Sequence, residues 1–323
     1  MALINGTPAS ETITGNNEAD TIFGFEGQDT IRGALGNDLI YGNQGNDQIL
    51  VNAPFGFDTV FGGQGNDTIA ANDVGQVLAY GNLGDDVIAG STGADTMFGG
   101  QGNDGLLGAA GDDLVYGNLG NDLISAGVPT AGNDTIYGGQ GTDTINLAGA
   151  NGRALIYGNL GNDVILGTEG ADTIFGGQGA DLITGRAGAD VLSGNLGADT
   201  FVYVSPADDS PSGAQANSAT SAGNLDTITS FVVGEDKLDF QVAATAGTFG
   251  TVTIGTSGDY KAAFDAAVAN KNGNQYVFVK DASGGGFLFA DVSAANGGIG
   301  GAFSDGDTAI FIASGSVTAT DIV

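Results

Sequence analysis

A single apolar residue recurs about every nine residues through the first two thirds of the chain, between stretches rich in glycine, asparagine, aspartate and threonine. The stretch Gly62–Ala70, Gly-Gly-Gln-Gly-Asn-Asp-Thr-Ile-Ala, is a clear copy of this unit. Its first six residues predict a glycine-rich turn, and its last three predict a short strand whose middle side chain faces inward. With positions numbered 1 to 9, the inward-facing residue stands at position 8 of 21 copies: Ile13, Ile22, Ile31, Ile40, Ile49, Val60, Ile69, Ala79, Ile88, Met97, Leu106, Val115, Ile124, Ile136, Ile145, Ile156, Ile165, Ile174, Ile183, Leu192 and Phe201.

A strand of three residues cannot bury its apolar side chain alone, so the copies are expected to stack on one another. Two copies, 18 residues, would make one turn with a loop at each of two edges. Loops two copies apart would then lie one strand spacing, about 4.8 Å, from each other. The pattern therefore predicts an all-β parallel solenoid whose narrow core is a column of position-8 side chains.

Position 6, the last residue of the turn, is a carboxylate in 19 copies, and Val77 and Ala154 replace it in the other two. Glycine at positions 1 to 4 is expected because left-handed backbone angles would let the loop carbonyls point at a common centre. Carboxylate and carbonyl oxygens suit a hard cation, and a flexible cage of six or more oxygens suits Ca²⁺ better than Mg²⁺. The candidate metal ligands are Glu11, Asp20, Asp29, Asp38, Asp47, Asp58, Asp67, Asp86, Asp95, Asp104, Asp113, Asp122, Asp134, Asp143, Asp163, Asp172, Asp181, Asp190 and Asp199.

This array, from Gly6 to Val202, resembles the RTX (repeats-in-toxin) family of calcium-binding nonapeptide repeats. The resemblance implies a right-handed parallel β-roll in which the position-6 carboxylates and the carbonyls of the preceding loop bind multiple Ca²⁺ ions. It provides no carboxylate at Val77 or Ala154, where calcium would depend on carbonyls and a neighbouring loop.

The two edges of the predicted solenoid differ in their loops. At one edge, the regular edge, every loop has six residues and a carboxylate, which predicts an unbroken calcium ladder. At the other, the bulged edge, four loops are preceded by one to three extra residues, and Val77 and Ala154 lie in the second loop of each adjacent pair. The segments Gly33–Asp104 and Gly108–Asp181 align throughout, bulges included, so a four-turn unit of about 75 residues occurs twice. The bulged edge is therefore expected to be a shaped surface.

Position 9 is aromatic after nearly every loop of the bulged edge and not after loops of the regular edge. Side chains alternate across a strand, so position 9 points away from the core and one sheet presents a ladder of aromatics, flanked at position 7 by alternating Thr and Leu or Val. Two interpretations stay open: the ladder stiffens its own sheet, or the stripe marks a partner surface. The candidate interface residues are Phe23, Tyr41, Phe61, Tyr80, Phe98, Tyr116, Tyr137, Tyr157 and Phe175.

The repeat stops at Val202, and residues 203–240 are expected to cap the roll. Ser205–Asn224 predicts a long loop, and Asp226–Phe240 predicts strand, turn and strand, similar to the stretch that closes the roll in serralysin-type proteases. The acidic residues of this cap are candidates for further calcium, although solvated surface charge is the favoured interpretation: Asp208, Asp209, Glu235, Asp236 and Asp239. The expected roll thus covers residues 1–202.

Residues 241–323 predict a small β-rich α+β domain with a helix over Asp259–Asn270. Its last residues, Thr-Ala-Thr-Asp-Ile-Val, resemble the uncleaved C-terminal signal of type I secretion substrates, and Met1–Thr14 has no features of a cleavable signal peptide. The expected strands of this domain are Tyr276–Val279, Phe287–Val292 and Ala309–Ala313.

The composition excludes several classes of function. A net charge of −31 excludes nucleic acid as a natural partner and argues against anionic membranes, because phosphate would be repelled. The chain has no Cys and no His, which removes disulfides, thiolate metal sites and the commonest general base. No apolar stretch is long enough to span a membrane as a helix.

We therefore expect a secreted, extracellular calcium-binding structural protein of the cell surface. It would leave the cell through a type I secretion apparatus, fold on extracellular Ca²⁺ and self-assemble, as a homo-oligomer or polymer, into a surface layer, sheath or filament. The alternative is a secreted polysaccharide-binding or adhesin module. We do not expect an enzyme, since a catalytic domain of this family would precede the array, which begins at Gly6.

Overall fold

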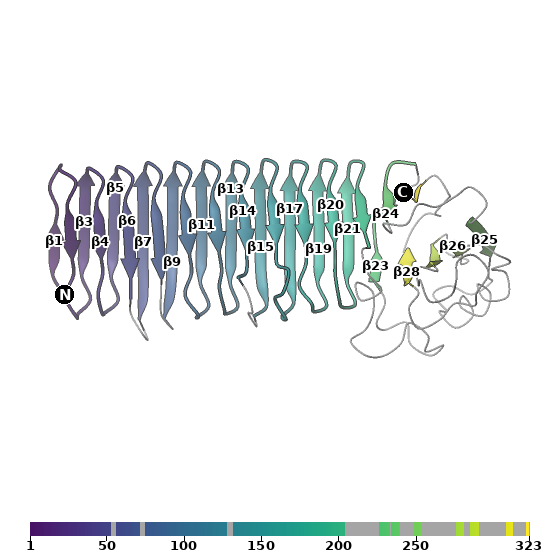
Figure 1. The fold of residues 1–323 in the computed structure, drawn as a ribbon, viewed down its shortest axis with the longest axis horizontal. Coiled ribbons are helices and arrows are strands. Elements are labelled where there is room, and N and C mark those ends of the chain that lie inside the picture. The colour runs from purple at the N-terminus through teal and green to yellow at the C-terminus, as the bar shows by residue number, and fades with distance from the viewer. Residues whose placement is uncertain are drawn as a thin grey trace. The chain divides into compact units, whose positions relative to one another are not determined.

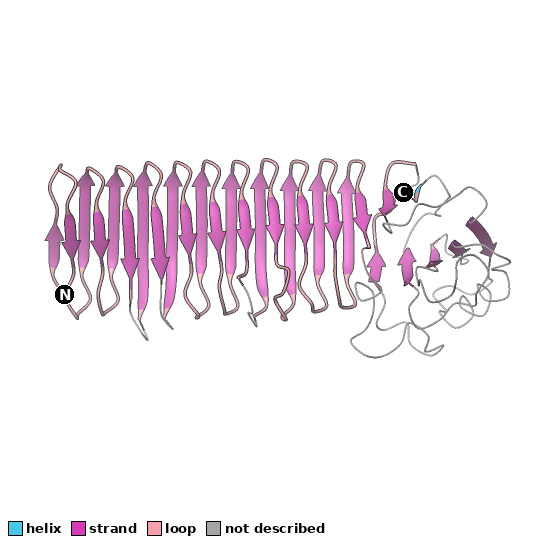
Figure 2. Ribbon diagram, in the orientation of Figure 1, coloured by secondary structure: helices cyan, strands magenta, loops and turns pink. Residues whose placement is uncertain are grey.

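The computed structural model shows an all-β parallel solenoid of about ten turns with 18 residues per turn, as the sequence predicts. The structure describes residues 1–52, 56–71, 75–127, 132–203, 226–232, 234–239, 249–253, 276–280, 285–290, 308–312 and 321–322. The chain divides into two compact units, Met1–Val164 and Ile165–Val323. Strands joined by short loops make up the first unit (Figures 1 and 2).

The first unit contains two parallel sheets, and each receives every second strand of the chain (Figure 1). We call the sheet of odd-numbered strands sheet A and that of even-numbered strands sheet B. Sheet A is ordered β1 (Leu3–Asn5), β3 (Thr21–Glu26), β5 (Leu39–Gln44), β7 (Phe57–Gln64), β9 (Gln76–Leu83), β11 (Thr96–Gln101), β13 (Leu114–Leu119), β15 (Asp134–Gln140) and β17 (Ala154–Leu160). Sheet B is ordered β2 (Thr12–Thr14), β4 (Thr30–Arg32), β6 (Gln48–Val51), β8 (Thr68–Ala71), β10 (Val87–Ala89), β12 (Gly105–Leu107), β14 (Leu123–Ser125) and β16 (Thr144–Asn146).

The core lies between the two sheets and consists of the position-8 column. These side chains pair in register from turn to turn, for example Val60 with Ala79 and Ala79 with Met97. All 21 are buried, and most, such as Ile69 and Ile88, are 0% exposed. The prediction of an apolar column is thus confirmed, and its burial is the main apolar contribution to stability.

Apart from β1, the strands of sheet A in the first unit are longer than the predicted three residues. They continue through positions 1 to 3 of the following turn, as in β11, where Phe98 is followed by Gly99 and Gly100 within the strand. Burial alternates along these six residues, so positions 7, 9 and 2 face outward while positions 8 and 1 face inward. The additional pairs Gly100↔Asn82 and Gln101↔Leu83 extend the sheet over the regular edge.

Glycine has two separate roles in the turns. Positions 2 and 4 take left-handed backbone angles, as at Asn82 (φ 80°) and Gly84 (φ 124°). Apart from Gly149 (φ 90°), the position-1 glycines are not left-handed, and there glycine is needed because a side chain would collide with the next turn: a Cβ on Gly24 would lie 2.6 Å from the carbonyl oxygen of Gly42. The expected left-handed requirement over positions 1 to 4 is therefore wrong at position 1, where close approach of the backbones is the cause.

At Val77 and Ala154 the last position of the bulged-edge loop belongs to the strand that follows it. The strands β7 and β9 extend backward until Asp58 pairs with Val77, and β15 and β17 do the same with Asp134 and Ala154. Val77 is 1% exposed and Ala154 is 4% exposed. Both positions without a carboxylate are thus apolar core positions.

The second unit repeats the two-sheet arrangement. One sheet contains β19 (Thr173–Gln178), β21 (Val191–Leu196) and β23 (Asp226–Ile228), and the other contains β20 (Leu182–Thr184), β22 (Thr200–Val202) and β24 (Lys237–Asp239). The strands β23 and β24 lie where the sequence predicts a strand pair. Asp236, interpreted above as solvated, is 1% exposed, because it takes the buried position 6 before β24.

The strand β28 (Thr308–Ile312) pairs in parallel with β23 and so adds the next rung, with Ile312 buried beside Ile228. The strands β27 (Gly286–Ala290) and β26 (Tyr276–Lys280) follow it in antiparallel order, and β25 (Phe249–Thr253) pairs with β26. The three strands predicted in this region are confirmed to within a few residues.

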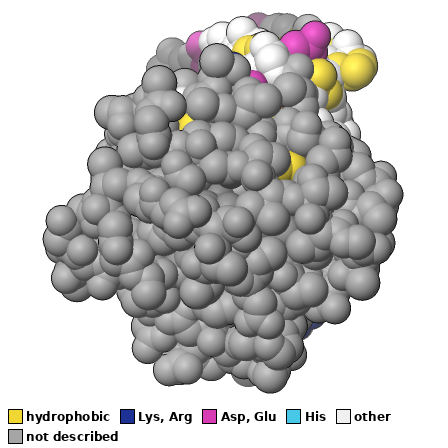
Figure 3. Space-filling view, turned by 90° about the vertical axis from the view of Figure 1, so that its right-hand side faces the viewer, with side chains coloured by type: hydrophobic (Ala, Val, Ile, Leu, Met, Phe, Trp, Pro, Cys, Tyr) yellow, Lys and Arg dark blue, Asp and Glu magenta, His cyan; other side chains and the backbone are white. Residues whose placement is uncertain are grey.

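The predicted helix over Asp259–Asn270 and the loop over Ser205–Asn224 lie outside the described residues. The division at residues 202 and 240 stays a prediction. In the described parts of the chain, no helix is long and apolar enough to cross a membrane. Where the described side chains are visible from one end, acidic and hydrophobic groups lie next to each other (Figure 3).

Candidate functional site

The position-6 carboxylates of the regular edge form a hydrogen-bonded column within each unit, and we call these carboxylates together the regular ladder. In each step of these columns the backbone N–H of one position-6 residue donates to Oδ1 of the aspartate one turn on, for example from Asp86 to Asp104 at 2.8 Å. The spacing follows from the strand spacing of the sheets. The ladder contains Glu11, Asp29, Asp47, Asp67, Asp86, Asp104, Asp122, Asp143, Asp163, Asp181 and Asp199, and Asp236 accepts the N–H of Asp199 at 3.0 Å.

The second carboxylate oxygen of many of these aspartates is buried without a hydrogen-bond partner. A buried anionic oxygen left in this state is costly unless a cation neutralises it. Within the described residues, the aspartates with such an Oδ2 include Asp29, Asp38, Asp47, Asp67, Asp86, Asp104, Asp113, Asp122, Asp143 and Asp199. The structure therefore has a row of oxygens that require a positive ligand.

Backbone oxygens lie beside these carboxylates. The point where a Cβ on Gly138 would stand is 2.5 Å from Asp143 Oδ2 and 2.7 Å from the carbonyl oxygen of Gly158, one turn on. The same pair of oxygens lies beside Gly24, where Asp29 Oδ2 is 2.8 Å and the Gly42 oxygen is 2.6 Å from the corresponding point. Oxygens from consecutive loops thus converge where glycine leaves space, which is the donor chemistry that Ca²⁺ prefers.

Most ligands at these sites have to be carbonyls. In the described part of the chain, no three Asp or Glu side chains gather closely enough to hold a metal by themselves. Carbonyl-rich cages are ordinary for Ca²⁺, whose coordination number of six to eight is filled partly by the backbone.

The bulged edge has a ladder too, but it is divided into three segments. The divisions fall at Val77 and Ala154, where an apolar residue within a strand takes the place of the carboxylate and pairs with Asp58 or Asp134. Asp226 ends the third segment and accepts the N–H of Asp190 at 2.8 Å; the sequence reasoning missed it, although Asp-Thr-Ile repeats the pattern of the array. The segments are Asp20, Asp38, Asp58, then Asp95, Asp113, Asp134, then Asp172, Asp190, Asp226.

The first loop of each bulged-edge segment satisfies its own carboxylate. Ser91 N–H donates to Asp95 Oδ2 at 2.6 Å, and the Ser91 hydroxyl accepts the N–H of Gly93 at 3.0 Å. Thr168 makes the same two contacts with Asp172 and Gly170, at 2.6 and 3.0 Å. These polar residues at position 2 favour a local turn of the Asx or Ser/Thr type.

Two N-terminal loops have the same arrangement. Asn16 N–H donates to Asp20 Oδ2 at 2.7 Å, and Thr7 N–H donates to Glu11 Oε1. Asn at position 2 does not distinguish these closed loops in the sequence, because Asn82 and Asn118 hold the same position in open loops. Among the loops that the structure describes in full, the predicted ligands therefore have two geometries, and their roles as ligands stay a prediction.

Burial raises the pKa of many ladder aspartates, such as Asp47 and Asp104. The pKa of Asp113 rises to about 8, first because of desolvation and then because Asp134 and Asp95 lie nearby. The same causes raise the pKa of Asp67 and Asp143 to about 7. A column of such carboxylates resists ionisation unless a cation binds between them.

The aromatic ladder lies on the outer face of sheet A, as predicted. From Phe23 to Tyr157 adjacent rings are stacked with centroids 4.8–5.0 Å apart and planes within 2–6° of parallel. Each inner ring therefore has both faces covered by its neighbours, and only ring edges and the tyrosine hydroxyls point outward.

Comparison with protein families agrees with this geometry. The model of the RTX calcium-binding nonapeptide repeat (4 copies) matches residues 5–40, 24–53, 55–73, 80–115, 106–128, 130–154, 148–183 and 166–201. The chain belongs to this family. Its repeats bind calcium, and their number implies multiple ions. None of the curated proteins searched matches this RTX chain.

Membership of the RTX family also gives coarse information on role and place. RTX repeats are typically structural rather than catalytic, and proteins that contain them are generally secreted to the outside of the cell.

Proposed function

We propose that this protein is a secreted structural protein that folds on extracellular Ca²⁺ and self-assembles into a cell-surface layer, sheath or filament. The observation that supports it best is the regular ladder, in which buried Oδ2 atoms without a partner recur turn after turn, as at Asp67, Asp86 and Asp104. The ligands we propose are the position-6 carboxylates of the open loops and the position-1 carbonyls of consecutive loops.

The mechanism is ion-coupled folding. At low cytosolic calcium the stacked carboxylates repel one another and the chain stays unfolded, fit for threading through a type I secretion apparatus. At the millimolar calcium outside the cell, binding neutralises the ladders and supplies folding free energy. The proposed export signal ends in Asp-Ile-Val, of which Asp321 is buried and Ile322 pairs with Leu238.

Circular dichroism during a calcium titration tests the folding step. The β-sheet signal is expected to be absent in excess chelator at neutral pH and to develop cooperatively as calcium is added. A full sheet signal in chelator would overturn this part of the proposal.

Electron microscopy of the purified protein with and without calcium tests the assembly step. Ordered sheets or fibres that require calcium would support it, and particles that stay monomeric would contradict it.

The alternative function, a polysaccharide-binding or adhesin module, is favoured by the open grooves lined by Asn and Gln on sheet A. The stacked rings disfavour it, because their faces are not open to a sugar. A monomer that binds a neutral glycan would replace the first proposal with this one.

A further inference from the structure

The outer face of sheet A has no charge over its central strands. We call the outward positions 7, 9, 2 and 3 of β7, β9, β11, β13, β15 and β17 the neutral face. Every residue at these described positions is Thr, Leu, Phe, Tyr, Gly, Asn or Gln. In a chain of net charge −31, such a face is where a second copy can approach with least repulsion.

The neutral face alternates between two kinds of turn. One kind reads Thr-aromatic-Gly-Gln at positions 7, 9, 2 and 3, as in β11, and the other reads Leu-Tyr-Asn-Leu, as in β13. The alternation is unbroken over the six strands, so the surface repeats every two strand spacings, about 9.6 Å. This two-turn repeat is shorter than the four-turn unit of the loops.

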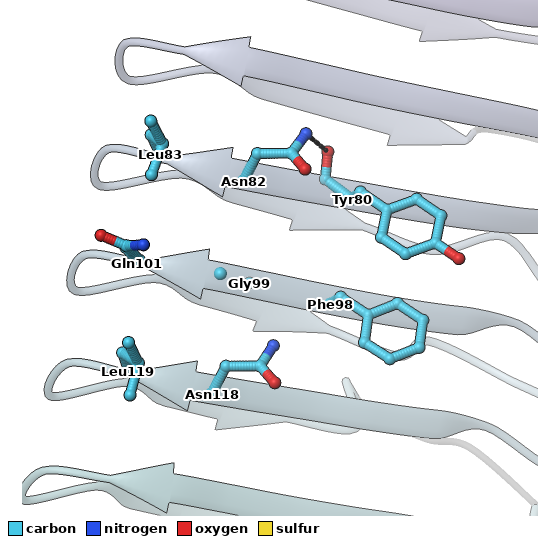
Figure 4. A pocket seen from close by; sticks show the side chains of 9 residues that line it. Tyr80, Asn82, Leu83, Phe98, Gly99, Gln101, Asn118 and Leu119 are labelled. Carbon is cyan, nitrogen blue, oxygen red and sulfur yellow. Dashed lines mark hydrogen bonds between the residues drawn. The ribbon is translucent and has the colours of Figure 1, made fainter.

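The two kinds of turn make ridges and grooves. Leu83, Leu119 and Leu160 are 40%, 40% and 39% exposed, and form the ridges. Between the first two lies a groove of about 540 Å³ over Gly99, Gly100 and Gln101. Figure 4 shows Leu83 and Leu119 on either side of Gln101, and Asn82 and Asn118 on either side of Gly99.

The groove recurs two strands further along sheet A. A second groove of about 480 Å³ lies between Leu119 and Leu160, over Gly139 and Gln140. Ridges and grooves on one face therefore have the same spacing, which is the condition for a surface to be complementary to itself.

Contacts within sheet A already fix the side chains of the neutral face. Asn82 Nδ2 donates to the carbonyl oxygen of Tyr80 at 3.3 Å (Figure 4). Asn118 and Asn159 donate in the same way to the carbonyl oxygens of Tyr116 and Tyr157 at 3.4 Å. The rings beside them are held in the stack. A surface with few rotamers left to lose binds at a lower entropic cost.

We propose that the neutral face is the contact between two copies of this chain, related by a twofold axis parallel to the strands of sheet A. The inference deepens the proposed self-assembly and rests on it. An axis of this direction reverses the order of the strands and keeps each row opposite its own row. With the axis between β11 and β13, Leu119 of one copy meets the Gly100–Gln101 groove of the other, and Leu83 meets the groove at Gly139.

The size of the face fits this role. Six strands at about 4.8 Å and six residues at about 3.3 Å give about 29 Å by 20 Å, or roughly 600 Å² per copy. The pair would bury roughly 1,200 Å², the lower end of the range for specific interfaces. A contact of this size is reversible on its own and suits an assembly that gains strength from many contacts.

Sedimentation velocity in millimolar calcium tests the proposal on the full chain. The variant Leu83→Gln/Leu119→Gln/Leu160→Gln removes the ridges, and the fold tolerates Gln there because Gln64, Gln101 and Gln140 occupy the same position in alternate turns. We expect its dissociation constant for self-association to rise about tenfold or more. The matched control, Val87→Gln/Leu107→Gln/Leu123→Gln, changes three exposed apolar residues of sheet B and is expected to associate like the wild type.

The outcomes separate the inference from the function on which it rests. A wild type that stays monomeric in calcium overturns both. A wild type that assembles, with a ridge variant that assembles equally well, overturns the neutral-face contact and leaves the proposed function standing. Equal weakening by the sheet B control also overturns the contact.

Cross-linking tests the direction of the axis. The chain has no cysteine, so Leu83→Cys and Gln140→Cys each introduce one thiol. A short bis-maleimide is expected to join the two variants when they are mixed, because residues 83 and 140 face each other across the axis. Efficient cross-linking of Leu83→Cys to itself, without the mixed product, would overturn this arrangement.

Discussion

At each buried aspartate of the regular ladder, the two carboxylate oxygens have different roles. Oδ1 accepts an N–H from the preceding turn, so it aligns the coil, while Oδ2 is directed to the carbonyls of position 1. Position 6 was predictable because the acidic residue recurs in the sequence. The closed loops were not, because they depend on whether position 2 donates its N–H to the carboxylate.

The two loop geometries predict different effects of Asp→Asn. In Asp104→Asn the change removes a charge where Oδ2 lacks a partner, so the calcium midpoint of folding is expected to rise roughly three- to tenfold. Asp95→Asn instead places an amide where two N–H groups donate, which should destabilise the fold and leave the number of bound ions unchanged. Calorimetric titration with calcium measures both, and an equal change in midpoint and ion number for the two variants would contradict the distinction.

The raised pKa values predict that acid partly replaces calcium. Where the pKa of an aspartate in the folded state lies near 6 to 8, above the ordinary 3.8, protonation of that aspartate stabilises the folded state. Stability of the calcium-free roll should therefore be highest below about pH 4 and fall as pH rises through 6 to 8. In excess chelator, the β-sheet signal at pH 5 is expected to exceed that at pH 8, and a signal independent of pH would contradict this.

At the scale of elements, most strands of sheet A are longer than the three residues that the repeat predicts, because they include positions 1 to 3 of the next turn. The period of the array predicted their number, order and buried face. Their length was not predictable, because the pairs at positions 2 and 3 depend on a backbone that crosses the edge in register with its neighbours. The alternation of Gly-Gly-Gln with Gly-Asn-Leu was visible in the sequence but gains meaning only once those residues share one face.

The stacked geometry predicts that the aromatics stabilise sheet A itself. Phe98 stacks on Tyr80 and Tyr116 at 4.8 Å each, so Phe98→Ser removes two ring pairs and should cost about 1–3 kcal/mol. Thermal unfolding in saturating calcium measures this loss. Phe98→Tyr is the control, since tyrosine keeps both stacks, and a Ser variant as stable as the wild type would show that stacking adds nothing.

At the scale of the molecule, the array needs its cation because charge and packing oppose each other. Stacking buries the apolar column and, in the same step, brings carboxylates to one strand spacing from each other. Bound calcium would neutralise these carboxylates at both edges and so allow the apolar column to stay buried. The closed loops at Asn16, Ser91 and Thr168, each the first of a bulged-edge segment, are where the fold depends least on metal.

This dependence should be specific for calcium. Mg²⁺ demands near-ideal octahedral geometry and dehydrates reluctantly, whereas consecutive loops offer many carbonyls in a flexible cage. In chelator at neutral pH the radius of gyration is expected near that of an unfolded chain of this length, on the order of 60 Å. Millimolar calcium should lower it sharply and equal magnesium should not. Small-angle scattering measures the difference, and equal compaction by the two ions would mean that the sites respond to charge alone.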